Sequence, residues 1–218
     1  MRTIINRRQD ESDTFFGFHS NRGCLYIEAY LLYHGAATIQ KKKPANLINL
    51  HSQGRDLASI WDCCVKKIET QLGVKIEILR ENSTGYLVLL YSEDLLTLRF
   101  SCQGSRGILE RYDYPEGKAN LDLLIERLRE RFKEVPMPHE VGLFLGYPCR
   151  DVCQFIKKEG ACSKGGALWK VYGNLRRAQV KLKRYQMAQK MMGEMLFQGR
   201  DISECAQYFR NHSLVGVS

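Results

Sequence analysis

Acidic residues are missing from one long stretch of this 218-residue chain. From Gly160 to Gly193 there is no Asp or Glu, but there are eight Lys and Arg residues, which supply nearly all of the formal net charge of +9. One-sided charge of this kind creates a positive field that attracts anionic partners. A basic helix that is simply solvated has the same pattern, so both interpretations stay open.

Long apolar runs are also missing. The apolar run Tyr86–Tyr91 is far shorter than the roughly 20 residues that span a bilayer. The first residues, Met1–Arg8, contain no apolar core of signal-peptide length. We therefore expect a cytoplasmic protein without membrane contact.

The sequence lacks the motifs of the common kinds of catalysis and of nucleic-acid recognition. It has no Gly-x-Ser-x-Gly, no Walker loop and no dinucleotide fingerprint, and no helix-turn-helix, RNA-recognition or zinc-finger signature. No reaction and no cofactor follow from the residues, and the sequence leaves open whether the protein is an enzyme.

Cysteine is present without the spacings that define thiol sites. No Cys-x-x-Cys pair occurs, which excludes zinc-ribbon and thioredoxin-type motifs, and in a cytoplasmic chain we expect reduced thiols. Cys149, Cys153 and Cys162, with His139, suggest a metal-linked or redox role, but their spacing matches no zinc or iron–sulfur pattern, so we predict no metal. Cys149 is expected to begin a helix, where a thiol pKa falls, and is the candidate reactive thiol.

Composition and periodicity predict a mixed α/β fold. The chain is 44% hydrophobic and 26% charged, which is typical of a globular protein and excludes a disordered or fibrous one. Helical spacing or helix signals occur at 25–34, 57–72, 92–101, 106–112, 121–132, 149–158 and after Asn174. Strands are expected at 45–50, 140–145 and 168–172, with a hairpin formed by 74–78 and 86–91.

These elements predict one α/β domain. We expect a central mixed sheet of about four to five strands, including the hairpin, flanked by helices. The domain is predicted at residues 23–198, after a polar N-terminal arm at 1–22 and before a weak C-terminal tail at 199–218. No internal linker rich in Pro, Gly or Ser divides it.

Several segments resemble the motifs of a known bacterial family. Pro138-His139-Glu140 and Leu145-Gly146-Tyr147-Pro148 look like the two signature motifs of the family called domain of unknown function 3793. Segments at 34–38, 43–47, 111–115 and 168–172 are similar to further parts of it, so the resemblance covers roughly residues 25–190. Gly35 and Ala37 stand where this family often has Cys and Pro. The resemblance implies a bacterial cytoplasmic protein and supplies no reaction.

The turn Gly146-Tyr147-Pro148 is the leading candidate for a ligand site. We expect it to join a strand to a helix, and ligands of open α/β sheets bind beyond the carboxyl ends of strands, where helix N-termini attract anions. We therefore predict that a small anionic ligand binds there, although a tight structural turn would have the same residues. The candidate contacts are His139, Glu140, Gly146, Tyr147, Lys170 and Tyr172.

The pair His139-Glu140 admits two interpretations. An imidazole beside a carboxylate can act as a general base or as half of a metal site. Adjacent residues of a strand point to opposite faces, however. In the alternative, His139 has a structural role and Glu140 pairs with a cation.

The basic C-terminal helix suggests a different function. Arg177, Lys181 and Arg184 follow the spacing i, i+4 and i+7 and so share one helix face. A row of this kind can contact phosphates, which makes non-enzymatic binding of nucleic acid or of an acidic protein the second hypothesis.

Overall fold

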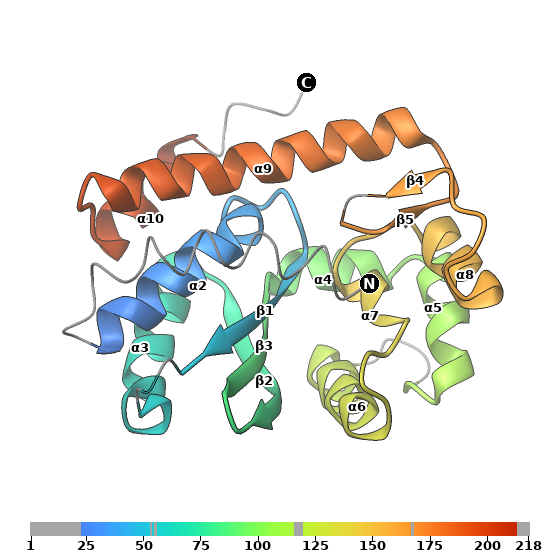
Figure 1. The fold of residues 1–218 in the computed structure, drawn as a ribbon, viewed down its shortest axis with the longest axis horizontal. Helices are drawn as coiled ribbons and strands as arrows, with labels where there is room; N and C mark the ends of the chain where they lie inside the picture. Colours follow the sequence, from blue (N-terminus) through green and yellow to red (C-terminus); the bar gives the residue numbers. More distant parts are fainter. Residues whose placement is uncertain (1–22, 53, 55, 116–119, 167, 213–218) are drawn as a thin grey trace.

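The structure, a computed structural model, describes residues 23–52, 54, 56–115, 120–166 and 168–212 (Figure 1). Its helices are α2 (Gly23–Ile39), α3 (Leu57–Leu72), α4 (Glu93–Phe100), α5 (Gln103–Leu109), α6 (Leu121–Glu134), α7 (Val141–Phe144), α8 (Cys149–Lys158), α9 (Leu175–Phe197) and α10 (Ile202–His212), with a 3-10 turn, η2, at Glu110–Tyr112. Its strands are β1 (Ala45–His51), β2 (Lys75–Asn82), β3 (Gly85–Tyr91), β4 (Gly165–Gly166) and β5 (Lys170–Val171). The arm predicted at 1–22 lies outside the described residues.

Three antiparallel strands form the central sheet in the order β1–β3–β2. The predicted hairpin is confirmed as β2 and β3, and the Asn82 side chain in its turn accepts hydrogen bonds from the backbone N–H and the hydroxyl of Thr84. The strand predicted at 45–50 is confirmed as β1, which pairs with β3 along its whole length. β3 therefore lies in the middle of the sheet, in keeping with its apolar sequence.

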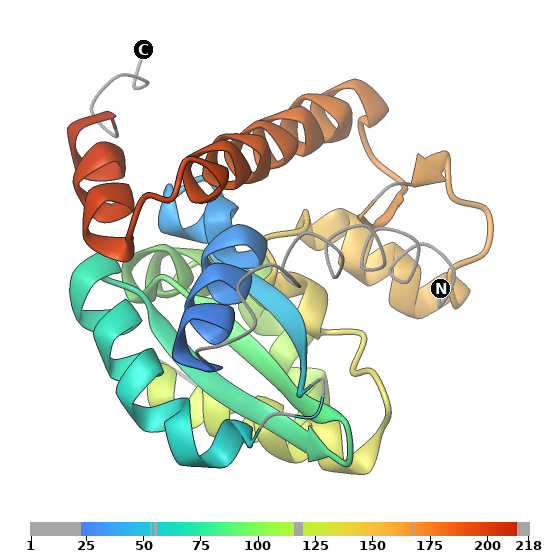
Figure 2. The ribbon, with the colours of Figure 1, turned by 60° about the vertical axis from the view of Figure 1, so that its left-hand side comes forward.

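Helices cover both faces of this sheet, because the side chains of β3 point alternately into two cores. Val88 and Leu90 face the first core, which contains residues of α2, α3, α9 and α10. Leu87 and Leu89 face the second core, which contains residues of α4 to α8. Figure 2 shows α2 in front of the sheet and α6 behind it. The mixed α/β class predicted from the sequence is thus confirmed.

The prediction of about four to five strands in the central sheet is wrong. Residues 140–145, expected as a strand, contain the short helix α7, and its residues are buried in the second core. A short continuous apolar run fits a buried strand and a buried helical turn equally well, so its pattern could not decide between them. The strand expected at 168–172 is reduced to β5, which pairs with β4 in a separate two-stranded sheet.

Capping residues set the boundaries of the longer helices. Asp56 accepts a hydrogen bond from the N–H of Ser59 at the start of α3, and Gly73 ends this helix with a left-handed φ of 61°. At the start of α9, the Asn174 side chain accepts a hydrogen bond from the N–H of Arg177. These residues satisfy backbone groups that a helix end leaves unpaired, as the sequence predicted.

The C-terminal part of the chain is helical. α9 has 23 residues and runs from the side of β4 and β5 over α2 towards α10 (Figure 1). α10 forms where the sequence analysis expected only a weak tail, and Ile202, Cys205 and Phe209 of this helix are buried in the first core. None of the described helices is both long and apolar enough to cross a membrane.

A disulfide joins α2 to α3. Its cysteines, Cys24 and Cys64, lie 40 residues apart in the sequence, with their Cα atoms 5.8 Å apart. The expectation of reduced thiols is therefore wrong for this pair. Sequence spacing could not indicate the bond, because the two helices come together only through the first core.

The backbone of Gly146, just after α7, lies against the ring of Pro44. Gly146 has a φ of +74°, and a Cβ atom placed on it would lie 2.5 Å from Cδ of Pro44. Only glycine meets both constraints, because other residues are strained at this φ and the side chain would collide with the ring.

We predict that Gly146→Ala lowers the free energy of unfolding by about 2 kcal/mol or more, from backbone strain and overpacking together. Gly199→Ala is the matched control, because Gly199 has a similar φ of +75° and a Cβ atom added to it would meet nothing within 4 Å. It should cost about 1 kcal/mol. Urea denaturation of both variants measures the difference, and equal losses would contradict the role of the Pro44 contact.

Candidate functional site

The turn after α7 connects the two cores. Tyr147 packs against residues of both cores and stacks on Trp169 with ring centroids 4.8 Å apart. Its hydroxyl donates a hydrogen bond to the carbonyl oxygen of Leu168, at 3.3 Å. Pro148 then caps α8. These contacts attach the turn to the segment before α9.

Two cations bind consecutive carbonyl groups of this turn. Lys181 of α9 donates from Nζ to the carbonyl oxygen of Gly146, at 3.0 Å, and Arg99 of α4 donates from Nη2 to the carbonyl oxygen of Tyr147. Because the carbonyls belong to neighbouring residues, the two positive groups lie close together. Burial, and then the charge of Arg99, lower the pKa of Lys181.

A third cation, Lys43, is buried beside them. Its side chain is 5% exposed, and its Nζ lies 5.9 Å from the ring centroid of Tyr147 and 5.7 Å from that of Tyr185. Burial, and then the nearby charge of Lys181, lower the pKa of Lys43 to about 7. The two rings provide cation–π contacts, which stabilise a desolvated ammonium only in part.

Polar atoms around Lys43 lack partners. Within the described residues, the hydroxyl of Tyr185 and Nε of Arg99 are buried without a hydrogen bond. Burial raises the pKa of Tyr185 to about 12, so its hydroxyl is a neutral hydrogen-bond donor at physiological pH. In the same part of the chain, neither Lys43, Arg99 nor Lys181 forms a salt bridge. We call this group the Lys43 cluster; its members are Lys43, Arg99, Tyr147, Lys181 and Tyr185.

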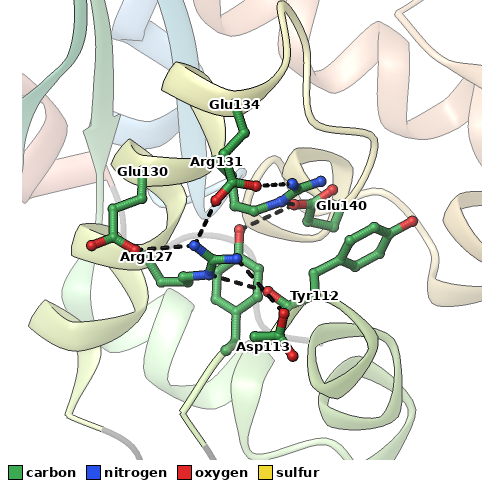
Figure 3. Close-up of polar contacts among 8 residues, drawn as sticks. Tyr112, Asp113, Arg127, Glu130, Arg131, Glu134 and Glu140 are labelled. Carbon is green, nitrogen blue, oxygen red and sulfur yellow. Dashed lines mark hydrogen bonds and ion pairs between the residues drawn. The ribbon is translucent and has the colours of Figure 1, made fainter.

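Glu140, predicted as a ligand contact, belongs to a separate ionic network (Figure 3). Its buried carboxylate accepts a hydrogen bond from Nε of Arg131, at 2.8 Å, and one from the hydroxyl of Tyr114, at 3.4 Å. Arg131 also pairs with Glu134, which Arg127 contacts in turn. The interpretation that Glu140 pairs with a cation is confirmed, and its role is to attach the segment before α7 to α6.

His139 does not work with Glu140. Its side chain is exposed, and its ring packs edge-on against Phe155, with centroids 5.0 Å apart. Glu140 is fully buried, so the two neighbouring side chains point into different surroundings. The structure therefore does not bring this pair together as a base or as a metal site.

A second buried carboxylate organises the segment before α9. Asp151, in the first turn of α8, accepts hydrogen bonds from Trp169 Nε1 at 2.9 Å and from the N–H groups of Tyr172 and Gly173 at 3.0 and 2.7 Å. Of the two candidate ligand contacts in this segment, Lys170 is exposed and Tyr172 is buried. Asp151 pulls the backbone of Tyr172 inward, which the sequence pattern could not indicate.

The predicted basic row on α9 is only partly exposed. Arg177 and Arg184 are exposed, whereas the side chain of Lys181 turns inward to Gly146. Lys181, the central residue of the predicted row, therefore belongs to the Lys43 cluster and does not share the exposed face with Arg177 and Arg184. The sequence analysis did not identify Lys43, Arg99 or Tyr185 as site residues. The available signal was that Lys43 lies in the family-like segment 43–47.

The cysteines considered as possible metal ligands do not lie together as a metal site. Among the described residues, the group of three potential ligand side chains within 4.8 Å of one another is Cys24, Glu28 and Cys64, and it contains the disulfide. Cys149, Cys153 and Cys162 form no such group with His139. Cys149 begins α8 as predicted, and its Sγ lies 3.3 Å from the hydroxyl oxygen of Ser105.

Fold and site together define an α/β protein with a three-stranded antiparallel sheet between two helical layers and a buried cationic cluster at the turn after α7. The model of one family, described as "Protein of unknown function (DUF3793)", matches residues 31–206, well over half of the chain, and the chain belongs to this family. Comparison with curated proteins and with solved structures finds no match.

We predict that Glu140→Gln lowers the free energy of unfolding by about 3 kcal/mol, because it removes the buried charge that pairs with the half-buried Arg131. Glu130→Gln is the matched control in the same network, since the Glu130 side chain is 54% exposed. It should cost no more than about 0.5 kcal/mol. Thermal denaturation of both variants tests this, and a Glu140→Gln protein as stable as the control would show that the buried pair contributes little.

Cys102 has a stronger structural case for reactivity than Cys149. It is exposed at the start of α5, and hydrogen bonds from the backbone N–H groups of Gly104 and Ser105, followed by nearby arginines, lower its pKa. We predict that iodoacetamide at neutral pH modifies Cys102 before Cys149 and before the exposed control Cys63, because the thiolate is the reactive form. Mass spectrometry of the peptides ranks the three rates, and faster labelling of Cys149 would restore the sequence-based choice.

Proposed function

We propose that the protein binds a small ligand carrying a carboxylate or phosphate group at the Lys43 cluster. The supporting observation is that three cations meet at the Gly146–Tyr147 turn without a carboxylate partner in the described chain, and that one of them, Lys43, is almost fully buried. Buried charges in proteins are normally paired. An anion at this position supplies the missing charge and accepts the unused hydrogen bonds.

The electrostatics of Lys43 support the proposal. Because the pKa of Lys43 is about 7, its amine is protonated only part of the time at neutral pH. An anion nearby favours the protonated amine, so binding takes up a proton. This coupling follows from burial and from the charge of Lys181, and it distinguishes the cluster from exposed lysines, which stay charged.

Two hollows elsewhere on the surface are weaker candidates for the ligand site. The larger, with a volume of about 590 Å³, follows β2 and is lined by Trp61, Arg129 and Lys133, but Arg129 already pairs with Glu77 at 2.6 Å. The smaller, about 330 Å³, is lined by Cys149 and Cys153, by Arg111 of η2 and Arg150 of α8, and by residues of α5. Neither combines a buried cation with unpartnered polar atoms.

We predict that sulfate, used as a stand-in for a phosphate group, binds the protein and that Lys181→Met weakens this binding about tenfold or more, because a charge-assisted hydrogen bond is lost. Lys183→Met is the matched control, since Lys183 is exposed two residues away on the same helix. Isothermal titration calorimetry at constant ionic strength measures the affinities, with oxalate as the carboxylate probe.

The Lys183→Met control distinguishes binding at a specific anion site from general attraction of anions to a basic protein. Lys183→Met should bind sulfate or oxalate as the unchanged protein does. Equal weakening by both substitutions, or no binding of either anion above that of chloride, would overturn the proposal.

We further predict that sulfate affinity falls between pH 6 and pH 8. Lys43 loses its proton as the pH rises through about 7, whereas sulfate keeps its charge over this range, so the attraction decreases. Titrations in buffers with different ionisation enthalpies should show proton uptake near pH 7. An affinity that does not change over this range would contradict a role for Lys43.

A further inference from the structure

We propose that Lys43 is a nucleophile that forms an imine with a small aldehyde or ketone bearing a carboxylate or phosphate group. The inference rests on the anion site proposed above and adds a covalent step at that site. It assigns the cluster a substrate class, the oxo acids and phosphorylated carbonyl compounds, and makes Lys43 a catalytic residue.

A lysine that forms an imine needs an amine that is not engaged in a hydrogen bond or a salt bridge. Lys43 has its Nζ between the rings of Tyr147 and Tyr185, at 5.9 and 5.7 Å from their centroids, and no described residue accepts a hydrogen bond from it. Most lysines of the molecule lie at the surface, whereas this one is 5% exposed. Apolar surroundings and a neighbouring cation are the two conditions that keep a lysine amine neutral and reactive.

The remaining members of the cluster match the other parts of such a substrate. Arg99 and Lys181 are fixed on the carbonyls of Tyr147 and Gly146 and still have donors to hold the anionic group. The Tyr185 hydroxyl is buried without a partner among the described residues and can donate a hydrogen bond to the carbonyl oxygen that Lys43 attacks. Separate protein groups can thus bind the anionic group of the substrate, donate a hydrogen bond to its carbonyl oxygen and supply the attacking amine.

The chemistry balances without a further reactant. The lone pair of neutral Nζ attacks the carbonyl carbon, and after proton transfer from nitrogen to oxygen a carbinolamine results. Loss of the hydroxyl group with a proton, as water, leaves the imine, which is protonated to an iminium ion. Hydrolysis reverses each step, so the bond is transient.

Burial and the neighbouring cation favour the neutral amine of Lys43, and the two aromatic rings offset this effect only in part. Burial, followed by repulsion from Lys181, lowers the pKa to about 7. Arg99 stands behind Lys181, while Tyr147 and Tyr185 remain neutral because burial raises the pKa of both phenols. About half of the Lys43 amine is therefore neutral at pH 7, against a small fraction of a percent for a lysine of ordinary pKa.

The test is trapping with cyanoborohydride, which reduces an iminium ion to a stable secondary amine. We expect glyoxylate, an aldehyde with a carboxylate, to convert Lys43 to its carboxymethyl derivative at least about tenfold faster at pH 7 than the exposed lysines Lys170 and Lys183. Peptide mass spectrometry of the full chain gives the rate at each lysine. The rate at Lys43 should level off above about pH 7, and it should fall when sulfate is added.

Two comparisons test the assignment further. Acetaldehyde, which has no anionic group, should show a smaller preference for Lys43 than glyoxylate does, because only the neutral amine then favours this lysine. Tyr185→Phe should slow trapping at Lys43 severalfold without changing the rate at Lys183. Because the rates are compared within the unchanged protein, the main result does not depend on a variant that folds.

The outcomes separate the two proposals. Sulfate binding that is weakened by Lys181→Met, together with trapping at Lys43 no faster than at Lys183, would overturn the imine and leave the anion site intact. Absence of sulfate and oxalate binding, together with equal trapping by glyoxylate and acetaldehyde, would overturn both.

Discussion

The contact between the Gly146 backbone and the Pro44 ring is the constraint on which the site depends. It brings the turn after α7 against the segment that leads into β1, so that Lys43 lies beside Tyr147. α9 then crosses this junction, and Lys181 closes it by binding the Gly146 carbonyl. A side chain at position 146 would move the turn away, and the cations of α4 and α9 would lose their common anchor.

Two buried carboxylates stabilise the surroundings of that junction, and neither serves the cluster. Glu140 is paired with Arg131 and attaches the segment before α7 to α6, and Asp151 holds the backbone before α9. The two carboxylates thus pair with groups on either side of the turn, whereas no carboxylate lies among the described neighbours of Lys43. This uneven distribution is the physical reason for placing an anion there, because a buried charge without a partner is costly.

Lys43 illustrates how position changes the chemistry of a common residue. A lysine amine in water is protonated and unreactive at neutral pH. Between two aromatic rings and next to a second cation, the same group titrates near pH 7, where it can act as a partial charge for an anion or as a nucleophile. Both proposed roles follow from one desolvated position, and they differ in which protonation state the ligand uses.

Local patterns in the sequence determined the hairpin β2–β3, strand β1 and the caps at Asp56 and Asn174. These features depend on residues close together in the chain, so spacing and turn chemistry predict them. Tertiary structure alone decided that Val141–Phe144 form a helix, that Lys181 turns inward from the basic row, and that Lys43, Arg99 and Tyr185 meet. Each of these depends on burial between segments far apart in sequence, where desolvation and charge pairing, rather than periodicity, select the conformation.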